Sequence, residues 1–172
     1  MKRLLCAAAA LSLSTAAIAA PEAPPTDPQI AQIATTAGQI DIVSANQALG
    51  ISRNPAVRAF ATEMVRDHTA MNDRALALVR KLHITPQANP TSASLLQMAG
   101  AKRGQYASLT GAAFDRGYVA SEVAYHKAVN AALRGALIPG AHNPELKSLL
   151  QSGLKLFEEH QAHAERLAAQ LK

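Results

Sequence analysis

Three histidines and one aspartate occupy the apolar sides of segments whose pattern predicts helices. His68 lies in the segment ATEMVRDHTAMN, residues 61–72, and His126 and His160 occupy the same kind of position further along the chain. Asp41 does so in the first such segment. Neutral imidazole and carboxylate are good ligands for zinc, iron or copper, and the cores of helical bundles are common metal sites. Four such side chains would complete a four-coordinate site if they meet.

Counting residues from two Asn-Pro turns predicts that they do meet. Asp41 precedes Asn54 by 13 residues and His68 follows it by 14, so each lies roughly 20 Å from the turn at about 1.5 Å per helical residue. The two later histidines each lie 17 residues from Asn143, or about 25 Å. Helices of roughly 40 Å would bring both pairs near the middle of a bundle, whichever end each turn occupies.

Further candidate ligands lie one helical turn away from these histidines. Glu122 precedes His126 by four residues and adds a possible carboxylate ligand. Met64 and Met71 flank His68, and their thioethers would suit copper, although methionine at this spacing is common in ordinary cores.

A second interpretation of the same residues requires no metal. Buried histidines often take part in hydrogen-bond networks in which each polar group is satisfied. Here one histidine would donate to Asp41, and the others would pair with hydroxyl groups such as those of Tyr118 or Tyr125. No phosphate-binding loop, nucleophile elbow, haem-attachment motif or His-Glu-x-x-His motif is present in the sequence. Both interpretations stay open, and a metalloenzyme is a third.

The helices that must position these residues follow from apolar residues at steps of three and four. Asn54-Pro55 and Asn143-Pro144 are start signals, because asparagine caps free backbone amides and proline fits the first helical position. Pro139-Gly140 is expected to stop the third long helix. The expected helices are residues 28–49, 54–83, 112–137 and 143–172, with a short extra helix over residues 94–106 weakened by two glycines.

This pattern predicts an all-α fold. Two hairpins with short turns, joined by one long connection, describe a four-helix bundle of the ferritin-like type. In that arrangement the long crossover between helices two and three carries the short extra helix. An ordinary up-down-up-down bundle is the alternative, in which the connection folds over one end.

The first residues predict export. Lys2 and Arg3 precede an apolar run that ends in small residues, which is typical of a cleaved signal peptide. We expect residues 1–19 to form this leader, 20–27 a flexible segment and 28–172 one helical-bundle domain. The mature chain would be periplasmic or secreted, with no transmembrane anchor, and without a thiol because Cys6 lies in the leader.

Charge argues against nucleic acid as a partner. Two of the basic residues lie in the leader, so the net charge falls from +5 to +3 on cleavage. Lysine and arginine are scattered among acids and form no basic run, whereas nucleic-acid surfaces need a clustered basic footprint. An envelope protein or a second copy of the chain is the expected kind of partner.

Several sequence blocks resemble the family called domain of unknown function 4142. The resemblance rests on residues 54–60, 64–69, 114–118 and 143–147, together with His126 and His160. It implies an exported bacterial protein with a ferritin-like bundle, in which the characteristic histidines correspond to His68, His126 and His160. Relatives commonly carry glutamate at the position of Asp41. No activity follows from the resemblance, and the chain lacks the paired Glu-x-x-His motifs of di-iron enzymes.

The function most in keeping with these residues is a non-catalytic binding module. It would be a stress or envelope protein that holds a metal ion or small ligand at mid-bundle. A structural or interaction protein with a polar core is the second hypothesis, and a metalloenzyme the third.

Overall fold

The computed structural model describes residues 24–171, and these residues form helices and no strands. The order of elements is α1 Asp27–Ile51, α2 Pro55–Lys81, α3 Pro90–Tyr106, α4 Gly111–Ala132, a π-helical turn η1 Leu133–Leu137, α5 Ile138–Gly140 and α6 Pro144–Gln170. The prediction of an all-α chain is confirmed. None of the helices in the described range is long and apolar enough to cross a membrane.

The helix starts follow from local chemistry. Asn54 Oδ1 accepts hydrogen bonds from the amides of Ala56 and Val57, at 2.9 and 3.4 Å. Asn143 Oδ1 does the same at the start of α6, where the distances are 2.9 and 3.1 Å. These bonds satisfy amides that have no partner within the helix. Both predicted Asn-Pro starts are therefore confirmed.

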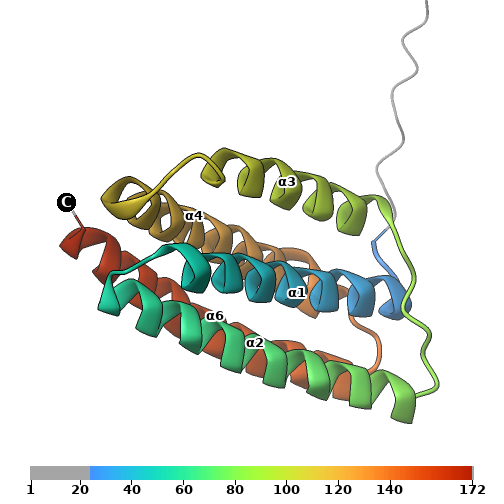
Figure 1. Cartoon of the computed structure of the whole chain (residues 1–172). Helices are drawn as coiled ribbons and strands as arrows, with labels where there is room; N and C mark the ends of the chain where they lie inside the picture. Colours follow the sequence, from blue (N-terminus) through green and yellow to red (C-terminus); the bar gives the residue numbers. More distant parts are fainter. Residues whose placement is uncertain (1–23, 172) are drawn as a thin grey trace, which may run out of the picture.

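The long helices form two antiparallel hairpins (Figure 1). α1 and α2 make the first, and α4 and α6 the second. An extended segment after α2 leads into α3, which returns the chain along the outside of the bundle before α4 begins, so that α2 and α4 run in the same direction. α3 packs mainly on α1 and buries only Ser92 and Tyr106. The crossover therefore covers one side of the bundle with α3.

Two helix ends differ from their predicted positions. α3 begins at Pro90 rather than residue 94, because Asn89 and Ser92 cap each other's backbone amides, and its two glycines do not interrupt it. The third long helix ends at the expected Pro139-Gly140 stop, but three residues beyond the predicted end at residue 137. Before that stop the chain widens into the π turn η1. Proline cannot bond to the carbonyl four residues earlier, and a π turn just before it changes the register of the available carbonyls.

The core consists of two hydrophobic clusters with a polar layer between them along the helices. One cluster holds Phe60, Phe114, Tyr118 and Met64, and the other holds residues such as Ile30, Leu133 and Leu150. The buried polar residues that separate them in sequence on α1, α2, α4 and α6 are Asp41, His68, His126 and His160. Apolar packing on both sides therefore excludes water from this layer.

Close packing within the first hairpin gives a testable prediction. A Cβ at Gly38 would lie 2.4 Å from Asn72 Oδ1, and Asn72 Nδ2 donates to the Thr35 carbonyl at 3.3 Å. Gly38→Ala should therefore lower the free energy of unfolding by about 1–2 kcal/mol despite its better helix propensity. Gly50→Ala, on the same helix with open space around it, should be neutral or stabilising in the same urea titration. Equal stability of the two variants would contradict the packing argument.

Candidate functional site

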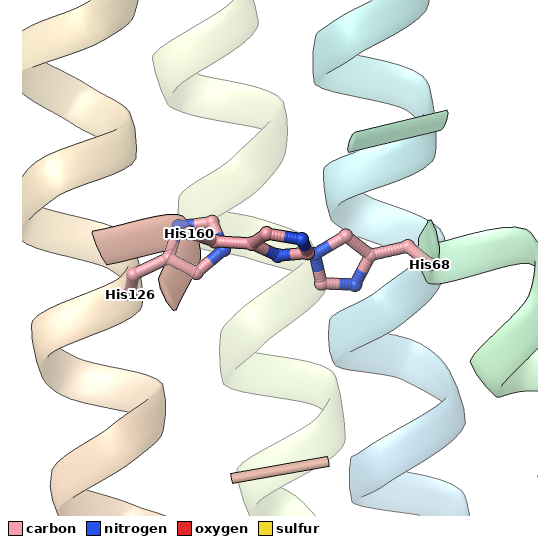
Figure 2. Close-up of side chains that lie close together, drawn as sticks. All are labelled: His68, His126 and His160. Atoms are coloured by element: carbon pink, nitrogen blue, oxygen red, sulfur yellow. The ribbon is translucent and has the colours of Figure 1, made fainter. Parts of the chain in front are cut away.

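Each long helix contributes one polar side chain to a single buried layer. Asp41 comes from α1, His68 from α2, His126 from α4 and His160 from α6, and each is 2% exposed or less. Figure 2 shows the three imidazole rings at one level, directed toward one another. The sequence-based expectation that these four residues meet agrees with their positions in the fold. Their role as metal ligands stays a prediction.

The three imidazoles are close enough to share one small ion. One ligand nitrogen from each histidine lies within 4.8 Å of the corresponding nitrogens of the other two. The ring centroids are 5.2 to 5.7 Å apart. Nitrogens around a tetrahedral zinc, with bonds of about 2 Å, are roughly 3.3 Å apart. Side-chain adjustments on the order of an ångström would therefore close the three rings around an ion.

Two of the histidines are oriented by hydrogen bonds on their far sides. His126 Nδ1 lies 3.0 Å from the Glu122 carbonyl oxygen, and His160 Nε2 lies 3.1 Å from Asp67 Oδ2. Since both partners are acceptors, these nitrogens carry the protons and donate. The remaining nitrogens, His126 Nε2 and His160 Nδ1, are then lone-pair acceptors. This pattern of an outer acceptor that fixes the tautomer is usual for metal-ligating histidines.

Four imidazole nitrogens of the layer have no hydrogen-bond partner among the described residues. This holds for His126 Nε2, for His160 Nδ1 and for both nitrogens of His68. His68 Nε2 is 3.3 Å from Asp41 Oδ2, but the two groups are not aligned as a hydrogen bond. A buried acceptor without a partner costs about 1–3 kcal/mol. Each of the three neutral imidazoles therefore carries one lone pair without a hydrogen-bond donor in the described residues, and His68 also carries an N–H without an acceptor.

Asp41 and Glu122 add a pair of buried carboxyl groups beside the histidines. Asp41 Oδ2 lies 4.0 Å from His126 Nε2, and Glu122 Oε2 lies 3.7 Å from His126 Nδ1. The carboxyl oxygens of the pair and a nitrogen of His126 lie within 4.8 Å of one another. Ser44 Oγ donates to Glu122 Oε1 at 3.0 Å, while Glu122 Oε2 has no partner in the described part of the chain.

Burial sets the protonation of this layer. It lowers the pKa of His68 to about 2 and that of His126 to about 4, with neighbouring imidazoles acting in the same direction. Burial also raises the pKa of Glu122 to about 7 and that of Asp41 well above its usual range. At neutral pH these imidazoles are neutral, which is the form that binds metals. A cation would in turn favour ionisation of the two carboxyl groups.

Asp67 is a functional candidate that sequence reasoning missed. It directly precedes His68, so it lies off the apolar stripe of α2, but α6 packs on that side and brings His160 to its carboxylate. The hydrogen bond from Arg66 lowers the pKa of Asp67 and keeps it ionised. Together with Glu63 and His160 it forms a third group of possible ligand atoms within 4.8 Å. Nearby, His163 lies 2.7 Å from Glu63 and outside the histidine layer.

The hydroxyl partners expected for a metal-free network lie elsewhere. Tyr125 donates to the Ala37 carbonyl at 3.0 Å, and the Tyr118 hydroxyl has no partner among the described residues. Neither tyrosine caps an imidazole. The two methionines beside His68 lie in apolar surroundings. Met64 belongs to a hydrophobic cluster, and Met71 lines a cavity on the other side of the layer.

Packed side chains enclose the histidine layer. The Phe157 ring stacks on His68 with centroids 4.8 Å apart and an angle of 11° between the planes. The layer also lies between two hydrophobic clusters. Such a site can hold a small ion firmly, but it offers little room for an organic substrate.

Comparison with known proteins supports the fold and the family. None of the curated proteins compared with the chain matches its sequence. The crystal structure of a DUF305 protein, assumed to be secreted, from Streptomyces coelicolor superposes with a TM-score of 0.68 at 11% sequence identity, covering 83% of this chain and 91% of that one. At this identity the likeness concerns the fold alone. The profile of the domain of unknown function DUF4142 matches residues 12–167, and the chain therefore belongs to the DUF4142 family.

Proposed function

We propose that the protein is an exported, non-catalytic helical-bundle protein that holds one transition-metal ion at mid-bundle. His68, His126 and His160 would be its ligands, with Asp41 as the fourth and Glu122 as the carboxyl group next to it. The proposal is carried by the three buried histidines, which each bring one ligand nitrogen within 4.8 Å of the others and each have a ring nitrogen without a hydrogen-bond partner among the described residues. A bound cation would accept these lone pairs and remove the cost of leaving them unsatisfied.

The donor set restricts which ions are suitable. Three imidazoles and one carboxylate suit zinc, iron or copper, and offer little to calcium or magnesium, which prefer oxygen ligands. A complete set of four protein ligands is typical of structural and storage sites rather than catalytic ones, which keep a position open. The burial of the four side chains also favours holding an ion over turning over a substrate.

Export and topology belong to the same proposal. Residues 1–19 would be removed as a signal peptide, leaving one domain over residues 28–172 for a stress or envelope role. The ferritin-like assignment is supported by α2 and α4, which run in the same direction with α3 between them in the chain (Figure 1). The fold likeness to a protein assumed to be secreted is compatible with export.

Metal analysis of the mature protein, purified without a histidine tag, tests the proposal. We expect close to one equivalent of zinc, iron or copper, and a rise in thermal stability when zinc is added to metal-free protein. Less than about a tenth of an equivalent of any of these metals, with no thermal shift on adding each of them, would reject it. The histidine layer would then be a polar layer that fixes helix register.

The orienting role of Asp67 gives a further prediction. Asp67→Ala should weaken zinc binding by about 10–100-fold, because outer partners hold ligating imidazoles in the right tautomer and orientation. The measurement is isothermal titration of metal-free protein. Asp73→Ala removes an exposed carboxylate from the same helix and should leave the affinity unchanged. An unaltered affinity in Asp67→Ala would show that the hydrogen bond to His160 does not support binding.

A further inference from the structure

An apolar cavity lies beside the histidine layer, toward the end of the bundle where α1 begins. It has a volume of about 70 Å³ and is lined by side chains from α1, α2, α4, η1 and α6. Phe157 is the wall that it shares with the histidine layer, since the same ring stacks on His68. The cavity is thus separated from the proposed metal site by one aromatic ring.

The lining of the cavity is almost wholly hydrocarbon. Asn72 is the only polar residue in it, and its amide already donates to the Thr35 carbonyl. Small residues at facing positions leave the space open, among them Ala34, Ala75 and Gly153. A bound water needs two to four polar partners, which these walls do not provide, whereas apolar walls accept apolar guests. The chemistry of the walls therefore selects an uncharged apolar molecule.

The π turn also borders this space. Leu133 and Leu137, at its two ends, both line the cavity. π turns are rare, are less favourable than α-helix and occur often at functional sites. The irregular turn here aims two leucine side chains at the same cavity.

We infer that this cavity is a binding site for a small, uncharged, apolar molecule of the size of xenon or dioxygen. A cavity of about 150 Å³ in another protein accepts benzene or xenon. The present one has about half that volume, so it fits guests of a few heavy atoms and excludes an aromatic ring. This inference does not depend on the metal proposal, because no metal ligand lines the cavity.

Xenon binding to the metal-free protein, followed by xenon-129 NMR, tests the inference. We expect a saturable shift in the unaltered protein. Ala75→Leu, at a buried lining position on α2, should abolish it because the added carbons fill the space. Ala70→Leu makes the same change on the exposed side of the same helix and should retain it. The absence of a saturable shift in the unaltered protein, or its persistence in Ala75→Leu, would overturn the inference.

A second variant keeps the test decisive if Ala75→Leu does not fold. Leu150→Ala enlarges the cavity and should strengthen xenon binding and allow benzene to bind. No change in either would count against the cavity as a binding site. Zinc titrations of the same samples report on the histidine layer separately, so failure of the metal proposal and failure of this inference give different results.

Discussion

His160→Ala is expected to abolish the stabilisation that zinc gives to the protein. With zinc at one hundred times its dissociation constant, binding to the folded state adds about 2.7 kcal/mol. For a domain of this size that corresponds to a rise of roughly 5–10 °C in Tm. The variant removes one of the three imidazoles of the layer together with the N–H that donates to Asp67. Thermal unfolding of metal-free protein, with and without zinc, measures the effect.

His163→Ala is the matched control for that experiment. Both histidines lie on α6, and each is paired with a carboxylate of α2: His160 with Asp67, and His163 with Glu63. Only His160 belongs to the three-histidine group. His163→Ala should keep the zinc-dependent rise in Tm. Loss of the rise in both variants would place zinc at the more exposed carboxylates, and its retention in both would place zinc outside the histidine layer.

Glu122→Gln is expected to stabilise the metal-free protein at pH 8 by an amount on the order of 2–3 kcal/mol. Burial raises the pKa of Glu122 from its ordinary 4.5 to about 7. Above pH 7 the folded protein must therefore keep an ionised carboxylate away from water, whereas the unfolded chain ionises it in water. Glutamine avoids this cost and still offers an oxygen to Ser44. Urea unfolding in the presence of a chelator, from pH 4 to pH 8, measures the difference.

The sign of the pH dependence distinguishes this effect from that of the histidines. The difference in free energy of unfolding between Glu122→Gln and the wild-type protein should shrink as the pH falls from 7 to 4.5. Over this range the Glu122 carboxylate of the folded wild-type protein is protonated before that of the unfolded chain. The lowered pKa values of His68 and His126 destabilise the wild-type protein and Glu122→Gln alike below about pH 6.5. In that range the unfolded chain binds protons at these histidines and the folded protein does not. Glu159→Gln, at an exposed position, controls for the loss of charge alone. A constant difference across the pH range would contradict the burial argument.

The parts of the fold that could be predicted from sequence depend on neighbouring residues or on the number of residues between two positions. Asn54 and Asn143 cap helices through neighbouring amides, so their roles can be read from a few residues. Asp41 and His68 lie at one level because their distances from the Asn54 turn, 13 and 14 residues, are nearly equal. Rise per residue is nearly constant in helices, which makes such counting accurate.

The features that could not be predicted depend on how helices face one another. Asp67 reaches His160 only because α6 packs against that side of α2. The available signal was an acid directly before a histidine on the apolar side of a helix. That signal can be interpreted only when the helix packed against the acid is known. The π turn at η1 was missed because one extra residue in a turn leaves no mark on the apolar pattern. The absence of hydroxyl caps on the imidazoles depends on side-chain geometry that spacing does not encode.

The division of the histidine layer between two hairpins has a mechanical consequence. His68 belongs to the first hairpin and His126 to the second, 58 positions later in the chain. The only cysteine of the sequence, Cys6, precedes the described residues, so no disulfide can join the hairpins there. An ion held between them would act as a removable cross-link. Separation of the hairpins would then require release of the ion, so that the bound ion would raise the free energy of partial opening by as much as it raises that of complete unfolding.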